Sequence, residues 1–232
     1  MISFWSRLFD FIAPRACVIC GSRLAISEDV ICTSCNLHIP RTDYHFDAYD
    51  NPMARLFWGR IPVERATALF FYLAHSGTSN ILYQLKYHHH PEIGEKMGRM
   101  LASEIKSSGF FDDIDAIVPI PLAKKRLRQR GYNQSMELAK GINQLTGIPI
   151  HSEAVVRKSF VTSQTRLHRW ERNDNVENVF SVTDVTVSLT GQHILLIDDV
   201  VTTGATITAC AKEMLKAGDM KFSILSLGLA KS

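Results

Sequence analysis

The sequence lacks the features of membrane-spanning, fibrous and disordered chains. Its 232 residues contain no apolar run of about 18, the length that a membrane-spanning helix needs. They contain no internal repeat and no low-complexity linker, and the 46% hydrophobic share is that of an ordinary globular protein. The net charge of +3 is too small to imply a nucleic-acid partner by itself. What remains is a globular chain of one domain with, at most, a small appendage.

Charge and cysteine are unevenly distributed along this chain. Residues 124–172 hold 11 basic and 3 acidic side chains, which leaves a net charge of −5 for the other residues. Four of the five cysteines fall between positions 17 and 35, and the fifth, Cys210, lies in a helical stretch where we expect a small buried side chain. Each of the two concentrations therefore needs its own explanation.

The first residues, MISFWSRLFDFIAPRA, are apolar but do not form a secretory signal. Arg7 and Asp10 interrupt them, and no positive charge precedes the apolar stretch. The apolar side chains within 2–12 recur at helical spacing: Ile2, Trp5, Phe9 and Ile12. We expect a short helix that packs on the protein itself, the alternative being peripheral contact with a membrane surface or a partner. The chain is expected in the cytoplasm, where thiols stay reduced.

From about residue 60, apolar strand-like runs alternate with amphipathic stretches. Strands are expected over 66–73, 116–120, 154–157, 193–197 and 222–229, and helices over 79–87, 93–107, 133–145 and 206–216. This alternation predicts an α/β fold with a mostly parallel sheet flanked by helices. We expect the N-terminal helix and the cysteine-rich module to occupy 1–58, and the α/β domain 59–232.

The four clustered cysteines form two pairs with metal-ligand spacing. Cys17 and Cys20, then Cys32 and Cys35, are each separated by two residues, which allows four thiolates to meet in one tetrahedral centre. Two disulfides and an iron–sulfur cluster are the alternatives, of which the first is disfavoured in a reducing compartment. We predict a structural Zn2+ site. Because protein fills all four positions, the site would support folding rather than catalysis.

The segment 194–206, ILLIDDVVTTGAT, is the most informative in the chain. Adjacent carboxylates, Asp198 and Asp199, follow an apolar strand and can hydrogen-bond a vicinal diol such as that of a ribose. The Thr/Gly loop that comes next opens a helix, and Gly204 allows backbone amides to approach a phosphate there. An Asp-Asp turn followed by a Thr-rich helix cap is the purely structural alternative.

This segment resembles the phosphoribosyl-pyrophosphate (PRPP) motif of the type I phosphoribosyltransferases. The four-cysteine N-terminus and three further motifs extend the resemblance over nearly the whole chain, to the ComF (competence protein F)/GntX-like family. The motifs are LKYHHHPEIG (85–94), VPIPLAKKRLRQRGYNQS (118–135) and TSQTRLHRWERNDNVENVF (162–180). The resemblance implies a type I phosphoribosyltransferase-like domain behind a small zinc-binding module.

The resemblance also implies site residues. The predicted PRPP-binding residues are Asp198, Asp199, Val200, Thr202, Thr203, Gly204, Ala205 and Thr206. The predicted pyrophosphate-binding residues are Pro121, Leu122, Lys124, Lys125, Arg157 and Lys158. The predicted catalytic residues are Asp199, Lys158 and Arg169. For the basic run over 124–130, pyrophosphate contact, nucleic-acid contact and a solvated face all stay open.

Two functions follow as expectations. The first is the binding or transfer of a phosphoribosyl group from PRPP with Mg2+, to an acceptor that the sequence does not identify; it would make the chain a probable phosphoribosyltransferase. The second is a role in DNA uptake during natural transformation, through contact with single-stranded DNA or with the competence and DNA-translocation proteins. The two are not exclusive, and the oligomeric state is left open.

Overall fold

The computed structural model describes residues 15–74, 76–87, 90–158 and 179–231. The expected helix within residues 2–12 lies outside the described part of the chain. The strands are β1 (Val63–Tyr72), β2 (Ala116–Pro119), β3 (Val155–Arg157), β4 (Phe180–Val182), β5 (His193–Val201) and β6 (Lys221–Ala230). The helices are α2 (Thr33–His38), α3 (Pro52–Arg55), α4 (Gly77–Tyr87), α5 (Pro91–Ile105), α6 (Lys124–Arg130), α7 (Gln134–Thr146), α8 (Asp184–Ser188) and α9 (Ala205–Met214), with 3-10 turns η1 (Tyr44–Asp47) and η2 (Lys106–Ser108).

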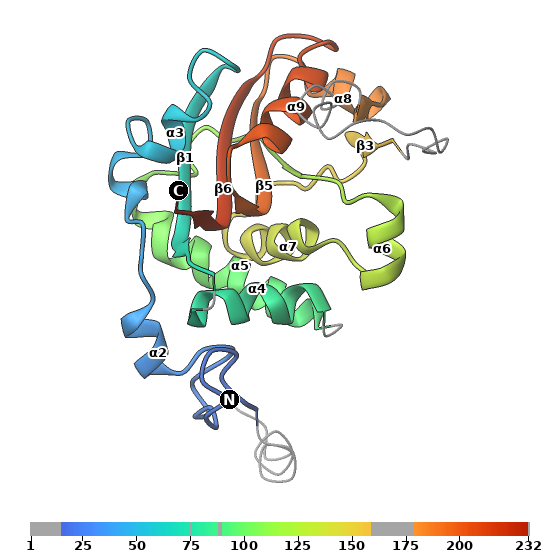
Figure 1. Ribbon diagram of the computed structural model, residues 1–232. Helices are drawn as coiled ribbons and strands as arrows, with labels where there is room; N and C mark the ends of the chain where they lie inside the picture. Colours follow the sequence, from blue (N-terminus) through green and yellow to red (C-terminus); the bar gives the residue numbers. More distant parts are fainter. Residues whose placement is uncertain (1–14, 75, 88–89, 159–178, 232) are drawn as a thin grey trace, which may run out of the picture.

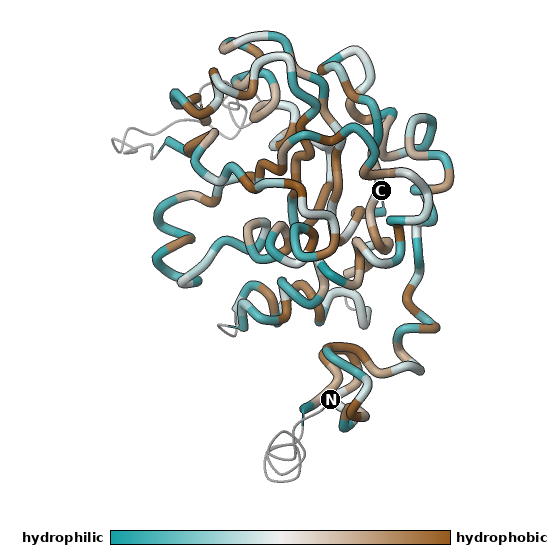
Figure 2. Tube along the Cα trace, turned by 180° about the vertical axis from the view of Figure 1, so that it is seen from behind, coloured by the Kyte–Doolittle hydropathy of each residue, from teal (hydrophilic) through white to brown (hydrophobic). Residues whose placement is uncertain are grey.

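Four parallel strands form the central sheet, in the order β1-β6-β5-β2 (Figure 1). The continuous apolar runs explain their position, because strands that are buried on both faces need apolar side chains throughout. Figure 2 shows these hydrophobic positions gathered in the strands at the centre. The predicted class, a mostly parallel sheet flanked by helices, is confirmed.

Successive side chains of β5 point into two different cores. Leu195 and Ile197 pack with α4, α5 and α7 on one face of the sheet. Ile194 and Leu196 pack with α3 and α9 on the other. This alternation follows from the period of two along a strand. Helices cover both faces, so the carboxyl ends of the strands are left as the place where a ligand can reach polar side chains.

Helices α5 and α7 approach each other closely through glycine. A Cβ atom at Gly141 would lie 1.9 Å from the carbonyl oxygen of Glu95, and one at Gly98 would lie 2.2 Å from that of Leu138. Neither helix therefore tolerates a side chain at its contact point. This packing fixes the start of α7 beside the end of β5, where the polar residues of the site lie.

The cysteine-rich segment packs beyond α4 and α5 (Figure 1). Its buried side chains, including Cys17, Leu24 and Ile31, join the core that contains those two helices. The chain then runs along β1, where Phe71 donates its backbone N–H to Pro40, and continues into α3. Phe57, just after α3, is buried in the core with β5 and α9. The domain division at residue 58 stays a prediction.

Candidate functional site at the carboxyl end of β5

The carboxyl end of β5 presents two acidic side chains and then a tight loop. Asp198 and Asp199 are half-buried there, and the loop ends at Gly204, the N-cap residue of α9. Gly204 has φ +72°, and a Cβ atom at this position would lie 2.7 Å from the ring of Phe57. Glycine is required for both reasons, since a side chain would strain the backbone and collide with a buried ring. The loop is thereby held at the N-terminus of α9.

A cavity of about 190 Å³ opens in front of the two carboxylates. Four basic side chains line it: Lys86 of α4, Arg126 and Arg130 of α6, and Arg157 of β3. Pro121 and Leu122, which follow β2, form another part of the wall, and the start of α7 completes it. Four cations and two carboxylates in so small a space fit a ligand that carries both phosphate and hydroxyl groups.

The two carboxylates differ in their electrostatic surroundings. Lys86 lies 2.8 Å from Oδ2 of Asp199 in a partly buried ion pair. Burial first, and the charge of Asp199 second, raise the pKa of Asp198 from 3.8 to about 7. The backbone N–H of Asp199, which donates to Asp198 Oδ1 at 2.9 Å, and the more distant charge of Lys86 act in the opposite direction. The pKa of Asp198 is therefore well above that of an ordinary aspartate.

Gln134 has an unpaired donor at the wall of this cavity. Its side chain is 2% exposed, and its Oε1 accepts a hydrogen bond from Nη1 of Arg130 at 2.8 Å. Its Nε2 has no hydrogen-bond partner although it is buried. A buried amide N–H without a partner is costly, so this donor fits a ligand oxygen in the cavity.

The structure brings together part of the residue set that the sequence predicts. Asp198, Asp199, Val200, Thr206, Pro121, Leu122 and Arg157 line the cavity. Thr202, Thr203, Gly204 and Ala205 line a smaller adjoining cavity of about 30 Å³, which Asp198, Val200 and Thr206 also border. The remaining predicted residues, Lys124, Lys125 and Lys158, are exposed and do not line either one. Arg169 lies outside the described residues.

Sequence reasoning missed four lining residues: Lys86, Asn133, Gln134 and Ser135. Two more, Arg126 and Arg130, belong to the basic run over 124–130, for which pyrophosphate contact was one of three open alternatives. All of them fall within the motifs at 85–94 and 118–135, so the resemblance contains the signal. On α6, Arg126 and Arg130 are four residues apart and share one face of the helix, unlike Lys124 and Lys125. Individual roles were not assigned because that face is known only once α6 is placed.

The oxygen atoms of Asp198 and Asp199 fit Mg2+, a hard cation that prefers carboxylate, water and phosphate oxygen. Two adjacent carboxylates at the mouth of a cationic cavity suit a metal that is shared with a polyphosphate ligand. Such an ion would compete with Lys86 for Asp199 and with the proton for Asp198.

The four N-terminal cysteines form the cluster that the spacing predicts. The Sγ atoms of Cys17, Cys20, Cys32 and Cys35 all lie within 4.8 Å of one another, and none is in a disulfide. Cys20 and Cys32 are 3.8 Å apart at sulfur, which matches the edge of about 3.8 Å in a tetrahedron with Zn–S bonds of about 2.3 Å. Backbone N–H groups of Cys32 and Cys35 point at sulfurs of the cluster. The donor set fits zinc.

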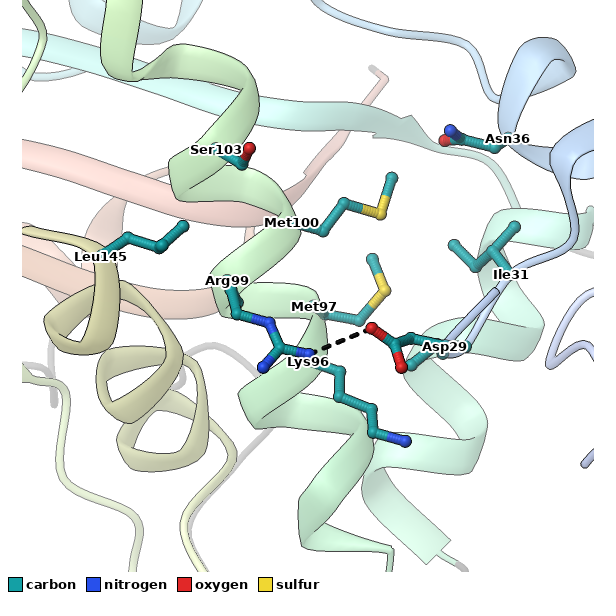
Figure 3. A pocket seen from close by; sticks show the side chains of 10 residues that line it. Asp29, Ile31, Asn36, Lys96, Met97, Arg99, Met100, Ser103 and Leu145 are labelled. Atoms are coloured by element: carbon teal, nitrogen blue, oxygen red, sulfur yellow. Dashed lines mark hydrogen bonds and ion pairs between the residues drawn. The ribbon is translucent and has the colours of Figure 1, made fainter. Parts of the chain in front are cut away.

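A second cavity, of about 350 Å³, lies where the cysteine-rich segment meets α5 (Figure 3). Arg99 donates to Asp29 at 3.0 Å across this junction, and Met97 and Met100 form its apolar side. The ion pair attaches the cysteine-rich segment to the helix.

Within the described residues, every helix is too short or too polar to span a bilayer.

Sequence comparison identifies relatives among bacterial proteins that are named for DNA utilization or for competence. No family model matches the chain. It is 29% identical over 205 residues to the DNA utilization protein YhgH of Escherichia coli (strain K12), covering 87% of this chain and 85% of that protein. It is 24% identical over 221 residues to competence protein F of Haemophilus influenzae, covering 92% and 96%. Competence protein ComFC of Bacillus subtilis is 34% identical over 116 residues, half of this chain and 44% of ComFC.

The comparison with solved structures gives matches of low TM-score and low identity. The allosteric regulatory enzyme of purine biosynthesis matches with a TM-score of 0.39 at 20% identity, over 59% of this chain. The glutamine PRPP amidotransferase from B. subtilis, complexed with ADP and GMP, scores 0.38 at 20% identity over 59%. This chain spans about a quarter of each of those chains. A Neisseria gonorrhoeae protein with bound ppGpp scores 0.38 at 18% identity, over 61% of this chain and 69% of that one.

Proposed function

The chain is a homologue of competence protein F and of YhgH, and from this premise we propose that it binds PRPP or a related phosphoribosyl ligand together with Mg2+. The observation that supports the proposal is the cavity at the end of β5. There, adjacent carboxylates and a threonine-rich helix N-terminus face four cationic side chains.

Each part of the proposed ligand has a matching part of the wall. The loop from Thr202 to Thr206 would hold the 5-phosphate at the N-terminus of α9. Asp198 and Asp199 would accept hydrogen bonds from the ribose hydroxyls. The pyrophosphate would lie among Arg126, Arg130 and Arg157, where the orphan Nε2 of Gln134 also finds an acceptor. Mg2+ would neutralise part of the pyrophosphate charge.

Calorimetry with Mg2+ and PRPP tests this proposal. We expect saturable heat for the wild-type chain and its loss in Asp198→Asn combined with Asp199→Asn, because the two amides can neither hold Mg2+ nor accept hydrogen bonds in the same way. The matched control is Asp112→Asn with Asp113→Asn, an adjacent pair outside the cavity. No saturable heat in the wild type, or equal affinity in the two double variants, would overturn the proposal.

Phosphoribosyl transfer is the reaction that such a site would support. The arginines that bind pyrophosphate would also stabilise the charge that it gains as it leaves, and exclusion of water would suppress hydrolysis. A screen of nucleobases and amines for PRPP-dependent release of pyrophosphate identifies the acceptor. Release that depends on one acceptor class, and that fails in the Asp198→Asn/Asp199→Asn variant, supports catalysis; release from none of them limits the site to binding.

We also propose that the chain contacts single-stranded DNA, as part of DNA uptake or use. The relatives' names favour this second function, and so does the outer face of α6, which we define as Lys124, Lys125 and Arg128. These three side chains are exposed and do not line the cavity, so they remain accessible to a second polyanion. Location in the cytoplasm and contact with DNA-translocation proteins stay predictions.

Salt-dependent binding of an oligonucleotide tests the DNA function. The triple variant Lys124→Ala, Lys125→Ala and Arg128→Ala should bind more weakly and with a shallower salt dependence, by about 0.7 in the logarithmic slope for each phosphate that is no longer neutralised. The control Lys212→Ala, Lys216→Ala and Lys221→Ala removes the same charge from α9, from the turn that follows it and from β6. An equal fall in affinity in both triple variants would contradict a role for this face. Binding of PRPP should survive in both.

A further inference from the structure

Helix α4 carries an exposed aromatic pair outside the face that packs in the core. Ile81, Leu82 and Leu85 form the buried face of the helix. Tyr83 and Tyr87, four residues apart, are 54% and 55% exposed. Their rings face each other with centroids 5.0 Å apart and planes at 39°. Both side chains are more than half exposed, so much of their surface is accessible to a ligand.

The aromatic pair adjoins the mouth of the cavity. The guanidinium of Arg130 lies 5.7 Å from the ring centroid of Tyr87, and Arg130 itself lines the cavity. Lys86, the residue before Tyr87, lines it too and ion-pairs with Asp199. Arg130 is the last residue of α6. The exposed rings therefore lie next to the helix whose outer face is cationic. Figure 1 shows the C-terminal end of α4 and the end of α6 on the same side of the molecule.

We infer that Tyr83 and Tyr87 form a stacking platform for the bases of single-stranded DNA, whose phosphates contact the outer face of α6. Aromatic side chains beside a basic surface are the arrangement by which proteins bind single strands without reading their sequence. This inference rests on the second proposed function and adds the surface that recognises the bases.

The shape of the surface favours a strand over other nucleobase ligands. Small ligands need a concave site that encloses most of their surface, whereas the two rings lie on the exposed side of a helix. The bases of a duplex are stacked on one another and leave no ring face for a tyrosine. A single strand offers unpaired bases for the rings and, next to them, phosphates for Lys124, Lys125 and Arg128.

Fluorescence anisotropy with a labelled oligo-dT of about 15 nucleotides tests the platform. The double variant Tyr83→Ala/Tyr87→Ala should bind about 5- to 150-fold more weakly, the range for removing one base stack. Tyr83→Phe/Tyr87→Phe should bind like the wild type, because the rings remain. The slope against salt should not change, since every phosphate keeps its cationic partner.

Tyr49→Ala is the matched control. Tyr49 is 61% exposed and stacks on Trp58 with centroids 5.7 Å apart, while Arg55 lies over the indole ring. Tyr49 therefore belongs to an exposed aromatic pair with an arginine beside it, as the platform tyrosines do, but it does not line the cavity. We expect unchanged affinity for the oligonucleotide in this variant.

Each outcome decides the inference. Undiminished DNA binding by Tyr83→Ala/Tyr87→Ala, or an equal fall in affinity in Tyr49→Ala, would overturn it. So would competition by dTMP at the dissociation constant of the strand, which would indicate a mononucleotide site. The proposed DNA function is tested separately. If the α6 triple variant loses DNA binding and Tyr83→Ala/Tyr87→Ala does not, the DNA function is supported and the platform is refuted. Calorimetry with PRPP on the tyrosine variants shows whether the cavity is intact.

Discussion

The cysteine cluster and the β5 cavity gather charged groups in opposite ways. The four thiols lie within 4.8 Å of one another, and burial together with the neighbouring thiols raises the pKa of Cys35. Four thiolates cannot form there without a metal cation. In the cavity the chain supplies a counter-ion of its own: Lys86 pairs with Asp199 at 2.8 Å. Burial and the charge of Arg126 lower the pKa of Arg157, and the charge of Asp198 acts against them.

The contrast predicts two kinds of dependence on a ligand. A cluster that needs an external cation to hold its anions ties metal binding to folding. A cavity in which Asp199 already pairs with Lys86 is stable when empty, and a ligand exchanges that ion pair for its own contacts. The two regions should therefore respond differently to metal removal, to pH and to substitution.

Removal of one ligand from the cysteine cluster should have the largest effect. In Cys35→Ser we expect the loss of zinc and a fall of more than about 4 kcal/mol in the free energy of unfolding of the cysteine-rich segment. Elemental analysis gives the zinc content. Hydrogen exchange should show faster exchange around residues 17–36 while the amides of β5 stay protected.

The fifth cysteine provides the control for that experiment. Cys210 is buried in α9, as expected from the sequence, and lies outside the cluster. Cys210→Ala should keep one zinc per chain. Much less than one zinc in the wild type, or an unchanged zinc content in Cys35→Ser, would contradict the predicted metal site.

The acidic end of β5 should give the protein a distinctive pH dependence. The pKa of Asp198 is raised from 3.8 to about 7, so the folded state holds this proton more tightly than the unfolded chain. Its contribution to stability is complete below about pH 4 and is lost as the pH rises towards 7, a change of up to about 4 kcal/mol. Asp198→Asn should remove this loss. Urea denaturation gives the free energy of unfolding of wild type and variant at pH 5 and at pH 8. The change between the two pH values in the wild type, minus the same change in the variant, is the contribution of Asp198.

The neighbouring charges predict the direction in which this profile moves. Asp199→Asn removes the carboxylate that helps to raise the pKa of Asp198, so the loss of stability should end at a lower pH. Lys86→Met removes a charge that lowers the same pKa, and the loss should extend to a higher pH. Identical profiles in the two variants would show that burial alone sets the pKa of Asp198.

Gly204 holds the loop beside the cavity, because the ring that it packs against, Phe57, comes from the segment just after α3. Gly204→Ala should cost about 1–3 kcal/mol in the free energy of unfolding, from the positive φ and from the contact of 2.7 Å with Phe57. Gly191→Ala is the control, since Gly191 has φ +82° and open space around it. A larger loss of stability at Gly204, partly recovered with Phe57→Leu, would confirm the contact; equal losses would refute it.

The elements that the sequence predicts well are those with strong local signals. The apolar run at 193–197 became β5, which continues four residues further to Val201. Helix α7 (Gln134–Thr146), with Asn133 as N-cap and Gly147 as C-cap, lies within one residue of the expected bounds. Helix α6 was not predicted, because KKRLRQR has a single apolar residue and no amphipathic period. It ends where Gly131 adopts φ +80°.

The site was predictable where one segment contains it. Asp198, Asp199 and the loop to Thr206 are consecutive, so their order alone indicates a phosphate and diol site. Lys86 and Gln134 come from two other helices, and their places depend on how α4 and α7 pack at the end of β5. No local pattern contains that information. Lys124 and Lys125 show the converse, since their type and position fit the site but their face of α6 does not line it.

Gln134 offers the finest test of the cavity. Gln134→Met keeps the volume but removes the orphan Nε2 together with Oε1, so affinity for PRPP should fall about 10- to 150-fold, the value of one hydrogen bond to a charged group. Gln134→Glu should weaken binding further, because a carboxylate replaces the donor and repels the anion. Calorimetry measures both, and Gln144→Met, an exposed glutamine of α7, is the control. Nε2 has no partner in the empty cavity, so any loss of stability in Gln134→Met should come from the hydrogen bond between Arg130 and Oε1. A large loss of stability with unchanged affinity would place Gln134 among the structural residues and would remove one of the anion contacts proposed for this cavity.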